Sequence, residues 1–297
     1  MRLIRFVFFS NYFLGLLAIL LSVEASSQLG LPFNSPAYYV CLFSWTVVYY
    51  TTAYVVPKSA AASRNPRSEW YRQHRVFVRC SQWFFSGLGV ASGIVLAATF
   101  WRNNVTIPVY YWLAAIPVPF AALLYYGFFP ALNLRSTGWL KPFVIGFVWA
   151  GVVTLFPVMA VRMEQHAELA QPALLPWFFL KNWMFCTVNA IMFDMKDYAD
   201  DANRQLKTFV VRVGLRRTIF YILMPLLALG LASFLIFASY RDLTNRRLIL
   251  NGLPFLIMFL VAWSLQNRRR ILFYLIVIDG LLLVKACCGI AGVYWTA

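Results

Sequence analysis

The chain has 297 residues, of which 62% are hydrophobic and only 12% are charged, and its formal net charge at pH 7 is +16. This composition excludes a soluble globular domain, which averages about 25% charged residues, and it excludes a disordered chain. It is typical of a polytopic membrane protein whose basic loops bind anionic lipid, so we predict no nucleic-acid binding.

Apolar stretches long enough for a spanning helix of about 20 residues follow one another along the chain. Seven of them carry no Asp, Glu, Lys or Arg: residues 6–23, 25–57, 80–101, 103–134, 142–161, 218–240 and 248–267. Two more contain charges, residues 169–193 with Lys181 and residues 271–295 with Asp279 and Lys285. Continuous apolarity is typical of helices rather than of a barrel. The pattern therefore predicts an all-α polytopic membrane protein with nine transmembrane helices.

The first stretch also resembles a signal peptide, because Arg2 and Arg5 precede it and small residues follow Glu24. Asn11 and Tyr12 inside the stretch, and the further spans behind it, favour an uncleaved first helix.

Charged residues inside spans are costly and usually face a cavity or a partner. Asp279 and Lys285 are six positions apart, so they point in different directions on one helix. We expect Asp279 to pair with Lys181 across helices; alternatively, Lys181 extends to the outer interface.

The basic residues set the expected orientation. With the amino terminus in the cytoplasm, most of the 26 Lys and Arg residues fall in cytoplasmic segments, as the positive-inside rule requires. Two long loops, residues 57–81 and 194–217, then lie on the cytoplasmic side, four helices apart. This spacing predicts a single transmembrane domain over residues 1–297 with duplicated halves of about residues 1–141 and 142–297.

Four of the ten acidic residues lie within eight positions, Asp194, Asp197, Asp200 and Asp201. Steps of three and four place Asp194, Asp197 and Asp201 on one helical face. Crowded carboxylates repel one another unless a cation lies between them, and Mg²⁺ prefers a few carboxylates together with phosphate oxygens. The spacing predicts a Mg²⁺ site that carries a phosphate group; a solvated acidic patch is the alternative.

The same segment continues with Lys207-Thr208 and then Val211-Arg-Val-Gly214. A D-x-x-D-x-x-x-D motif followed by this pattern resembles the second aspartate-rich motif of the intramembrane (UbiA-type) prenyltransferase superfamily. The resemblance covers nearly the whole chain and implies nine helices around a central cavity, with two aspartate-rich loops at its cytoplasmic side.

The chain departs from that superfamily at the first motif, which usually reads N-D-x-x-D-x-x-x-D. No acidic residue occurs between Glu24 and Glu69, and only Asn65-Pro66-Arg67 resembles residues that often follow the motif. Cations are expected to compensate, because arginine and lysine bind phosphate. The substrate-binding candidates are Lys58, Arg72, Arg75, Arg79, Lys141 and Lys207. For Lys141 and for the three arginines, whose spacing places them on one helical face, anchoring of the loops alone is the alternative.

The resemblance implies that Mg²⁺ on the aspartates binds an isoprenoid diphosphate and that the prenyl group passes to a small hydrophobic acceptor. Aromatic residues such as Trp45, Tyr49, Tyr50 and Tyr54 either line the isoprenoid tunnel or pack the bundle. The sequence singles out no catalytic residue. Two alternatives remain: a catalytically degenerate relative that binds lipid or serves as a partner subunit, and a transporter, which the clustering of acids at the membrane edge disfavours.

Overall fold

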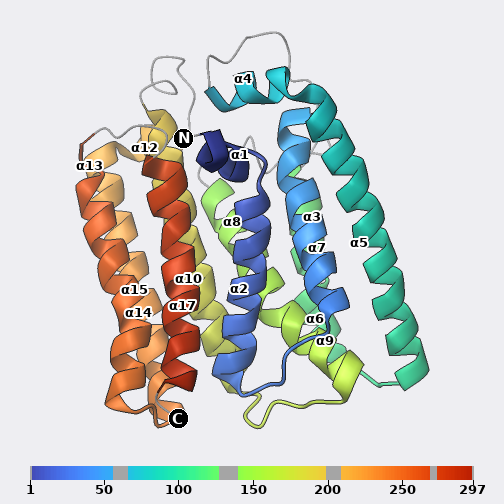
Figure 1. Cartoon of the computed structure of the whole chain (residues 1–297). Coiled ribbons are helices and arrows are strands. Elements are labelled where there is room, and N and C mark those ends of the chain that lie inside the picture. The colour runs from blue at the N-terminus through green and yellow to red at the C-terminus, as the bar shows by residue number, and fades with distance from the viewer. Residues whose placement is uncertain (1, 56–65, 127–139, 199–208, 268–272, 296–297) are drawn as a thin grey trace.

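A computed structural model describes residues 2–55, 66–126, 140–198, 209–267 and 273–295. These residues form helices and no strands, and the long helices stand side by side in one bundle (Figure 1). The predicted all-α fold is therefore confirmed.

The helices follow one another in the order α1 (Arg2–Phe9), α2 (Tyr12–Leu29), α3 (Pro36–Val55), α4 (Pro66–Gln73), α5 (Arg75–Asn103), α6 (Val109–Ala115), α7 (Pro117–Tyr126), α8 (Lys141–Ala150), α9 (Phe156–Gln165), α10 (Leu174–Asp194), α12 (Phe209–Val213), α13 (Leu215–Thr218), α14 (Met224–Tyr240), α15 (Asn245–Ser264) and α17 (Asp279–Tyr294). Short π-helical segments join α8 to α9 and α13 to α14, and another precedes α17. Three continuous helical rods result: Lys141–Gln165, Leu215–Tyr240 and Tyr274–Tyr294.

Six rods in the described part of the chain are long and apolar enough to cross a membrane: Tyr12–Leu29, Arg75–Asn103, Lys141–Gln165, Leu215–Tyr240, Asn245–Ser264 and Tyr274–Tyr294. Each overlaps one of the predicted spans over most of its length. Helices α3, with 20 residues, and α10, with 21, stand in the same bundle but carry polar residues along their length. The predicted count of nine crossings stays a prediction.

The first span differs from the prediction at both of its ends. Helix α2 begins after Asn11, which adopts a left-handed conformation (φ 67°) that separates it from α1. It then continues through Glu24 to Leu29, whereas the end of the charge-free stretch had placed a boundary at Glu24. That boundary is wrong because Glu24 is only 1% exposed and lies inside the bundle.

The partners of Glu24 are two lysines from distant helices. Lys181 on α10 places its Nζ 3.4 Å from Glu24 Oε1, and Lys285 on α17 donates to the other carboxylate oxygen. The expected pair between Lys181 and Asp279 is therefore wrong. Since Glu24 was assigned to a loop, the sequence offered only Asp279 as a partner inside the membrane.

Helix α10 occupies the middle of the bundle. It packs against α8 and α14, while α17 packs against α2 and α15. At the contact with α8 the helices approach so closely that a Cβ on Gly146 would lie 2.2 Å from Thr187 Oγ1. This close packing brings the start of α8 next to the end of α10.

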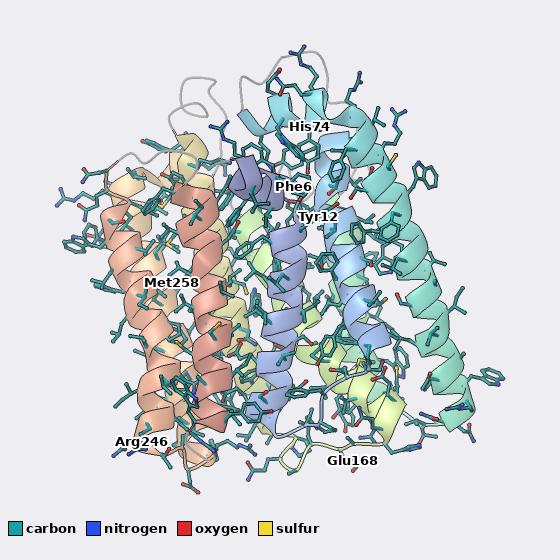
Figure 2. All side chains as sticks on the ribbon, in the orientation of Figure 1. Phe6, Tyr12, His74, Glu168, Arg246 and Met258 are labelled. Atoms are coloured by element: carbon teal, nitrogen blue, oxygen red, sulfur yellow. The ribbon has the colours of Figure 1, made fainter. Side chains whose placement is uncertain are left out.

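Helices α1, α4, α12 and α13 lie at one end of the bundle, which we call the basic end (Figure 1). Phe6 and His74 mark this end in Figure 2, and Glu168 and Arg246 mark the opposite one. Trp70 of α4 joins Phe6 and His74, with its ring centroid 6.3 Å from the Phe6 ring and 4.6 Å from the His74 ring. Aromatic packing thus holds α1 against α4.

Candidate functional site

A cavity of about 280 Å³ lies at the basic end, between helices α2, α3, α4, α7, α8, α10 and α17. The charged residues in its lining are Arg67, Lys141, Asp194, Lys196 and Asp279. Apolar and aromatic side chains form the rest of the lining, including Val144, Ile145 and Val148 from one face of α8. The cavity therefore combines charge with an apolar interior.

Lys141 and Asp194 form an ion pair in this cavity. Lys141 begins α8, Asp194 ends α10, and their Nζ and Oδ1 atoms are 2.5 Å apart. The side chains are 26% and 15% exposed, so water screens the pair only partly. A carboxylate at a helix C-terminus meets the unfavourable end of the helix dipole, and the lysine compensates for this repulsion.

The other two predicted metal ligands are less fully described. The backbone of Asp197 lies in the 3₁₀ turn Met195–Asp197 directly after α10. Its side chain and the whole of Asp201 lie outside the described residues, as do Lys58 and Lys207. No group of three His, Cys, Asp or Glu side chains able to hold a metal occurs among the described residues. The aspartate triad accordingly stays a prediction, with Asp194 placed at the cavity.

The prediction that Arg72, Arg75 and Arg79 share one helical face is wrong, because α4 ends at Gln73 and a new helix, α5, begins at Arg75. Arg72, Arg75 and Arg79 are exposed, and none of them lines the cavity. Arg72 instead pairs with Glu69, at 2.8 Å, and its hydrogen bonds hold the pKa of the Glu69 carboxyl below its usual value.

Three charged residues of the cavity were not among the predicted site residues: Arg67, Lys196 and Asp279. The charges of Arg67 and Lys196 act on the Asp279 carboxyl. In the sequence Arg67 belongs to Asn65-Pro66-Arg67, which resembles residues that follow the superfamily's first motif, and Asp279 is a charge inside a span. These signals did not show that the two residues line one cavity, because that depends on how α4 and α17 pack.

Residues of α3 and α4 form a second part of the lining, which we call the α3–α4 wall: the tyrosines Tyr49, Tyr50 and Tyr54, and Arg67. Trp149 of α8 faces the same cavity and donates from Nε1 to the Tyr50 hydroxyl at 2.5 Å. Trp45, also predicted to lie near the tunnel, is 46% exposed and is not part of the lining.

The described residues provide a test of the predicted Mg²⁺ site. Asp194 offers one carboxylate on the α10 side, and the following turn continues the aspartate-rich segment. The α3–α4 wall offers phenol groups and a guanidinium instead. Among the described residues the α10 side thus offers one carboxylate, which Lys141 already binds, so a Mg²⁺ ion there would need further oxygen ligands from the rest of the aspartate-rich segment.

A second cavity, of about 320 Å³, is lined by Tyr38, Trp112, Glu164 and apolar side chains. Glu164 accepts hydrogen bonds there from the backbone N–H of Ser35, at 2.9 Å, and from its hydroxyl. This cavity has no basic residue in its lining, so it lacks the groups that bind a phosphate.

Comparison with known proteins identifies the family. A family model described as the UbiA prenyltransferase family matches residues 73–273, which is more than half of the chain. No curated protein and no solved structure matches the chain. The matched region includes Lys141, Asp194 and the aspartate-rich segment, and it confirms the resemblance seen in the sequence. The chain is thus a helical membrane protein that belongs to the UbiA prenyltransferase family.

Proposed function

We propose that the chain is a membrane prenyltransferase that binds an isoprenoid diphosphate in the cavity at the basic end and transfers the prenyl group to a small hydrophobic acceptor. The observation that supports this most strongly is the composition of the cavity, in which Lys141, Lys196 and Arg67 share one space with apolar side chains. Such a lining matches a substrate with an anionic head and an apolar tail. The basic end would then face the cytoplasm.

The cationic side chains bind and orient the diphosphate. Lys141 and Lys196 donate charge-assisted hydrogen bonds to phosphate oxygens, which are stronger than bonds between neutral groups. Their fixed charge also stabilises the negative charge that develops on the diphosphate as it leaves. Lys196 is held over the Phe193 ring, 4.7 Å from its centroid, so its ammonium is positioned before substrate arrives.

The apolar part of the cavity accommodates the prenyl chain. Val144, Ile145 and Val148 present one face of α8 to it. Tyr50 and Trp149 add aromatic ring faces, which attract positive charge and can stabilise a cationic prenyl group.

Asp194, Asp197 and Asp201 are the proposed ligands of one Mg²⁺. When bound, the ion supplies electrophilic assistance to the departure of the diphosphate. Lys141 binds the Asp194 carboxylate and so orients one of these ligands.

The proposal is tested by turnover of a panel of prenyl diphosphates and hydrophobic acceptors in detergent, in the presence of Mg²⁺. Asp194→Asn is expected to lower the rate by at least about 100-fold, since it removes a charge from the leaving-group site. Asp197→Asn is expected to behave similarly. Asp242→Asn is the control, because Asp242 is exposed and lies between α14 and α15, outside the cavity lining. Equal rates for the wild type, Asp194→Asn and Asp197→Asn would exclude the metal site.

A second candidate is a catalytically degenerate relative that binds lipid or acts as a partner subunit. Two observations favour it: no acidic residue occurs between Glu24 and Glu69, and the Asp194 carboxylate already binds Lys141. It predicts ligand binding without product for every donor and acceptor in the same panel. Detection of a prenylated product rules it out.

The three exposed arginines are proposed to attract the anionic substrate from a distance. Replacing Arg72, Arg75 and Arg79 together by Gln is expected to slow substrate association by less than about tenfold, because exposed charges act through screened fields. Association rates compared at low and high salt check this. At high salt the variant and the wild type should bind substrate at the same rate. A slower association of the variant that persists at high salt would indicate that the arginines contact the substrate directly.

A further inference from the structure

The Asp279 side chain is a carboxylate that lines the cavity without a bonded partner. It lies inside the last apolar rod, Tyr274–Tyr294, and is partly buried. Among the described residues, no hydrogen bond or ion pair reaches its oxygens, whereas Asp194 binds Lys141 and Glu24 binds two lysines. A charged group inside a span is costly, and one that faces a cavity without a partner indicates a functional site.

Two cations of the same cavity act on this carboxyl group from a distance. Arg67 belongs to α4 and Lys196 to the turn after α10, and the charges of both reach Asp279. No contact of ion-pair length joins either of them to it in the part of the chain that the structure describes. The Asp279 oxygens can therefore accept a hydrogen bond from a ligand in the cavity.

The backbone beside Asp279 is held by the neighbouring helix α10. Asn189 is 5% exposed and donates from Nδ2 to the Ile278 carbonyl oxygen at 2.8 Å. The π-helical segment Tyr274–Ile278 ends directly before Asp279. Such segments inside α-helices occur frequently at functional sites. The carboxylate is thus carried by a backbone that a second helix fixes, as a catalytic group requires.

Asp279 lies deeper in the cavity than the ion pair at the basic end. Asn189 precedes Asp194 by five residues, which is about 7.5 Å along α10. Because Asn189 binds the residue before Asp279, the Asp279 backbone lies at about this depth. Ile145, which is part of the apolar lining, follows Lys141 by four residues or about 6 Å along α8. A diphosphate beside Asp194 and Lys141 would therefore place the prenyl carbon attached to it near the level of Asp279.

We infer that Asp279 is the catalytic base of the proposed prenyl transfer and that the acceptor is an apolar molecule with a hydroxyl group. The inference rests on the proposed function and deepens it. The hydroxyl group donates a hydrogen bond to the Asp279 carboxylate. As its oxygen forms a bond to the first prenyl carbon, the bond from that carbon to the diphosphate oxygen breaks, and the electron pair leaves with the diphosphate. The hydroxyl proton passes to Asp279, which returns it to water after the product leaves.

The test compares the wild type with Asp279→Asn in detergent, with Mg²⁺, a prenyl diphosphate and a panel of apolar alcohols and phenols. Asn keeps the size of the side chain but cannot take up the proton, so the rate of formation of the O-prenylated product should fall at least about 100-fold. The KM for the prenyl diphosphate should stay within about threefold of the wild-type value, since Asp279 does not hold the diphosphate.

Chemical rescue provides a readout that a structural role would not change. Asp279→Ala leaves space for a small carboxylate, so added formate is expected to raise its rate of transfer at least about tenfold. Asp242→Asn is the control, because Asp242 is exposed and lies outside the cavity lining. It should transfer at the wild-type rate, and formate should change neither its rate nor that of the wild type.

Thermal unfolding separates a catalytic carboxylate from a structural one. Asp279→Asn should unfold at the wild-type temperature or above it, because the change removes a charge that no described residue bonds. A lower unfolding temperature, or a variant that does not fold, would show that Asp279 is a structural counter-ion of Arg67 and Lys196. Either result would overturn the inference.

The outcomes distinguish this inference from the proposed function. Transfer that is unchanged in Asp279→Asn, or that formate does not restore in Asp279→Ala, overturns the role of Asp279 while the proposed transferase stands. Prenylation only of acceptors without a hydroxyl group has the same consequence. A wild type that forms no prenylated product with any acceptor contradicts both.

Discussion

Glu24→Gln is expected to lower the free energy of unfolding by about 3–5 kcal/mol, which is the usual cost of removing one partner from a buried ion pair. The carboxylate is 1% exposed and is shared by Lys181, which is 3% exposed, and Lys285, which is 4% exposed. Gln leaves both ammonium groups inside the bundle without their counter-ion. Unfolding in detergent, followed by heat or by denaturant, measures the change.

Lys181→Met is the matched control for this prediction. It removes the longer of the two contacts, at 3.4 Å, and leaves Glu24 and Lys285 as a neutral pair. Met also fills space beside Phe178, over whose ring the ammonium lies at 4.0 Å. We therefore expect a much smaller loss of stability than for Glu24→Gln. A Glu24→Gln protein as stable as Lys181→Met would show that the carboxylate does not compensate the two lysines.

Gly146→Ala is expected to destabilise the protein by about 1–3 kcal/mol, the range for overpacking a close contact. The added Cβ would lie 2.2 Å from Thr187 Oγ1, 2.8 Å from Thr187 N and 2.9 Å from its Cα. A side chain can rotate away, but the backbone of α10 cannot, so α8 and α10 must separate. Because Lys141 and Asp194 come from these two helices, the ion pair should loosen and prenyl transfer should slow.

Gly93→Ala provides the comparison, since a Cβ at Gly93 on α5 meets nothing within 4 Å. Replacing a helical glycine by alanine in open space gains up to about 1 kcal/mol of helix propensity. Unfolding of both variants in the same detergent, together with turnover, checks the prediction. A Gly146→Ala protein that unfolds like the wild type would mean that the two helices are not in the close contact described.

Most of the fold could be predicted from local features of the sequence. Whether a stretch of about 20 residues crosses a membrane depends on its own apolarity, because the bilayer requires helices with few charges. The six apolar rods accordingly overlap predicted spans. The D-x-x-D-x-x-x-D segment likewise indicated the family that the matching family model confirms.

The same approach was wrong at Glu24 because it took that charge as the boundary between two apolar stretches. A buried carboxylate is tolerated where lysines from other helices compensate it, and those partners are 157 and 261 positions away in the chain. A single sequence does not show which residues form a pair when they lie so far apart along the chain. The partner expected for Lys181 was wrong for the same reason.

The candidate site, too, could be predicted from the sequence only in part. Asp194 and Lys141 could be named from the motif and the family resemblance, but their ion pair depends on the close packing of α8 against α10. Arg67 and Asp279 could not be identified as cavity residues, since α4 and α17 come together only in the folded bundle.

The sequence by itself determined the helical membrane architecture and the family, because apolarity and a local motif are properties of single segments. Only the tertiary structure decided which charges are buried together and which line the cavity, because helix packing brings distant residues within reach of one another.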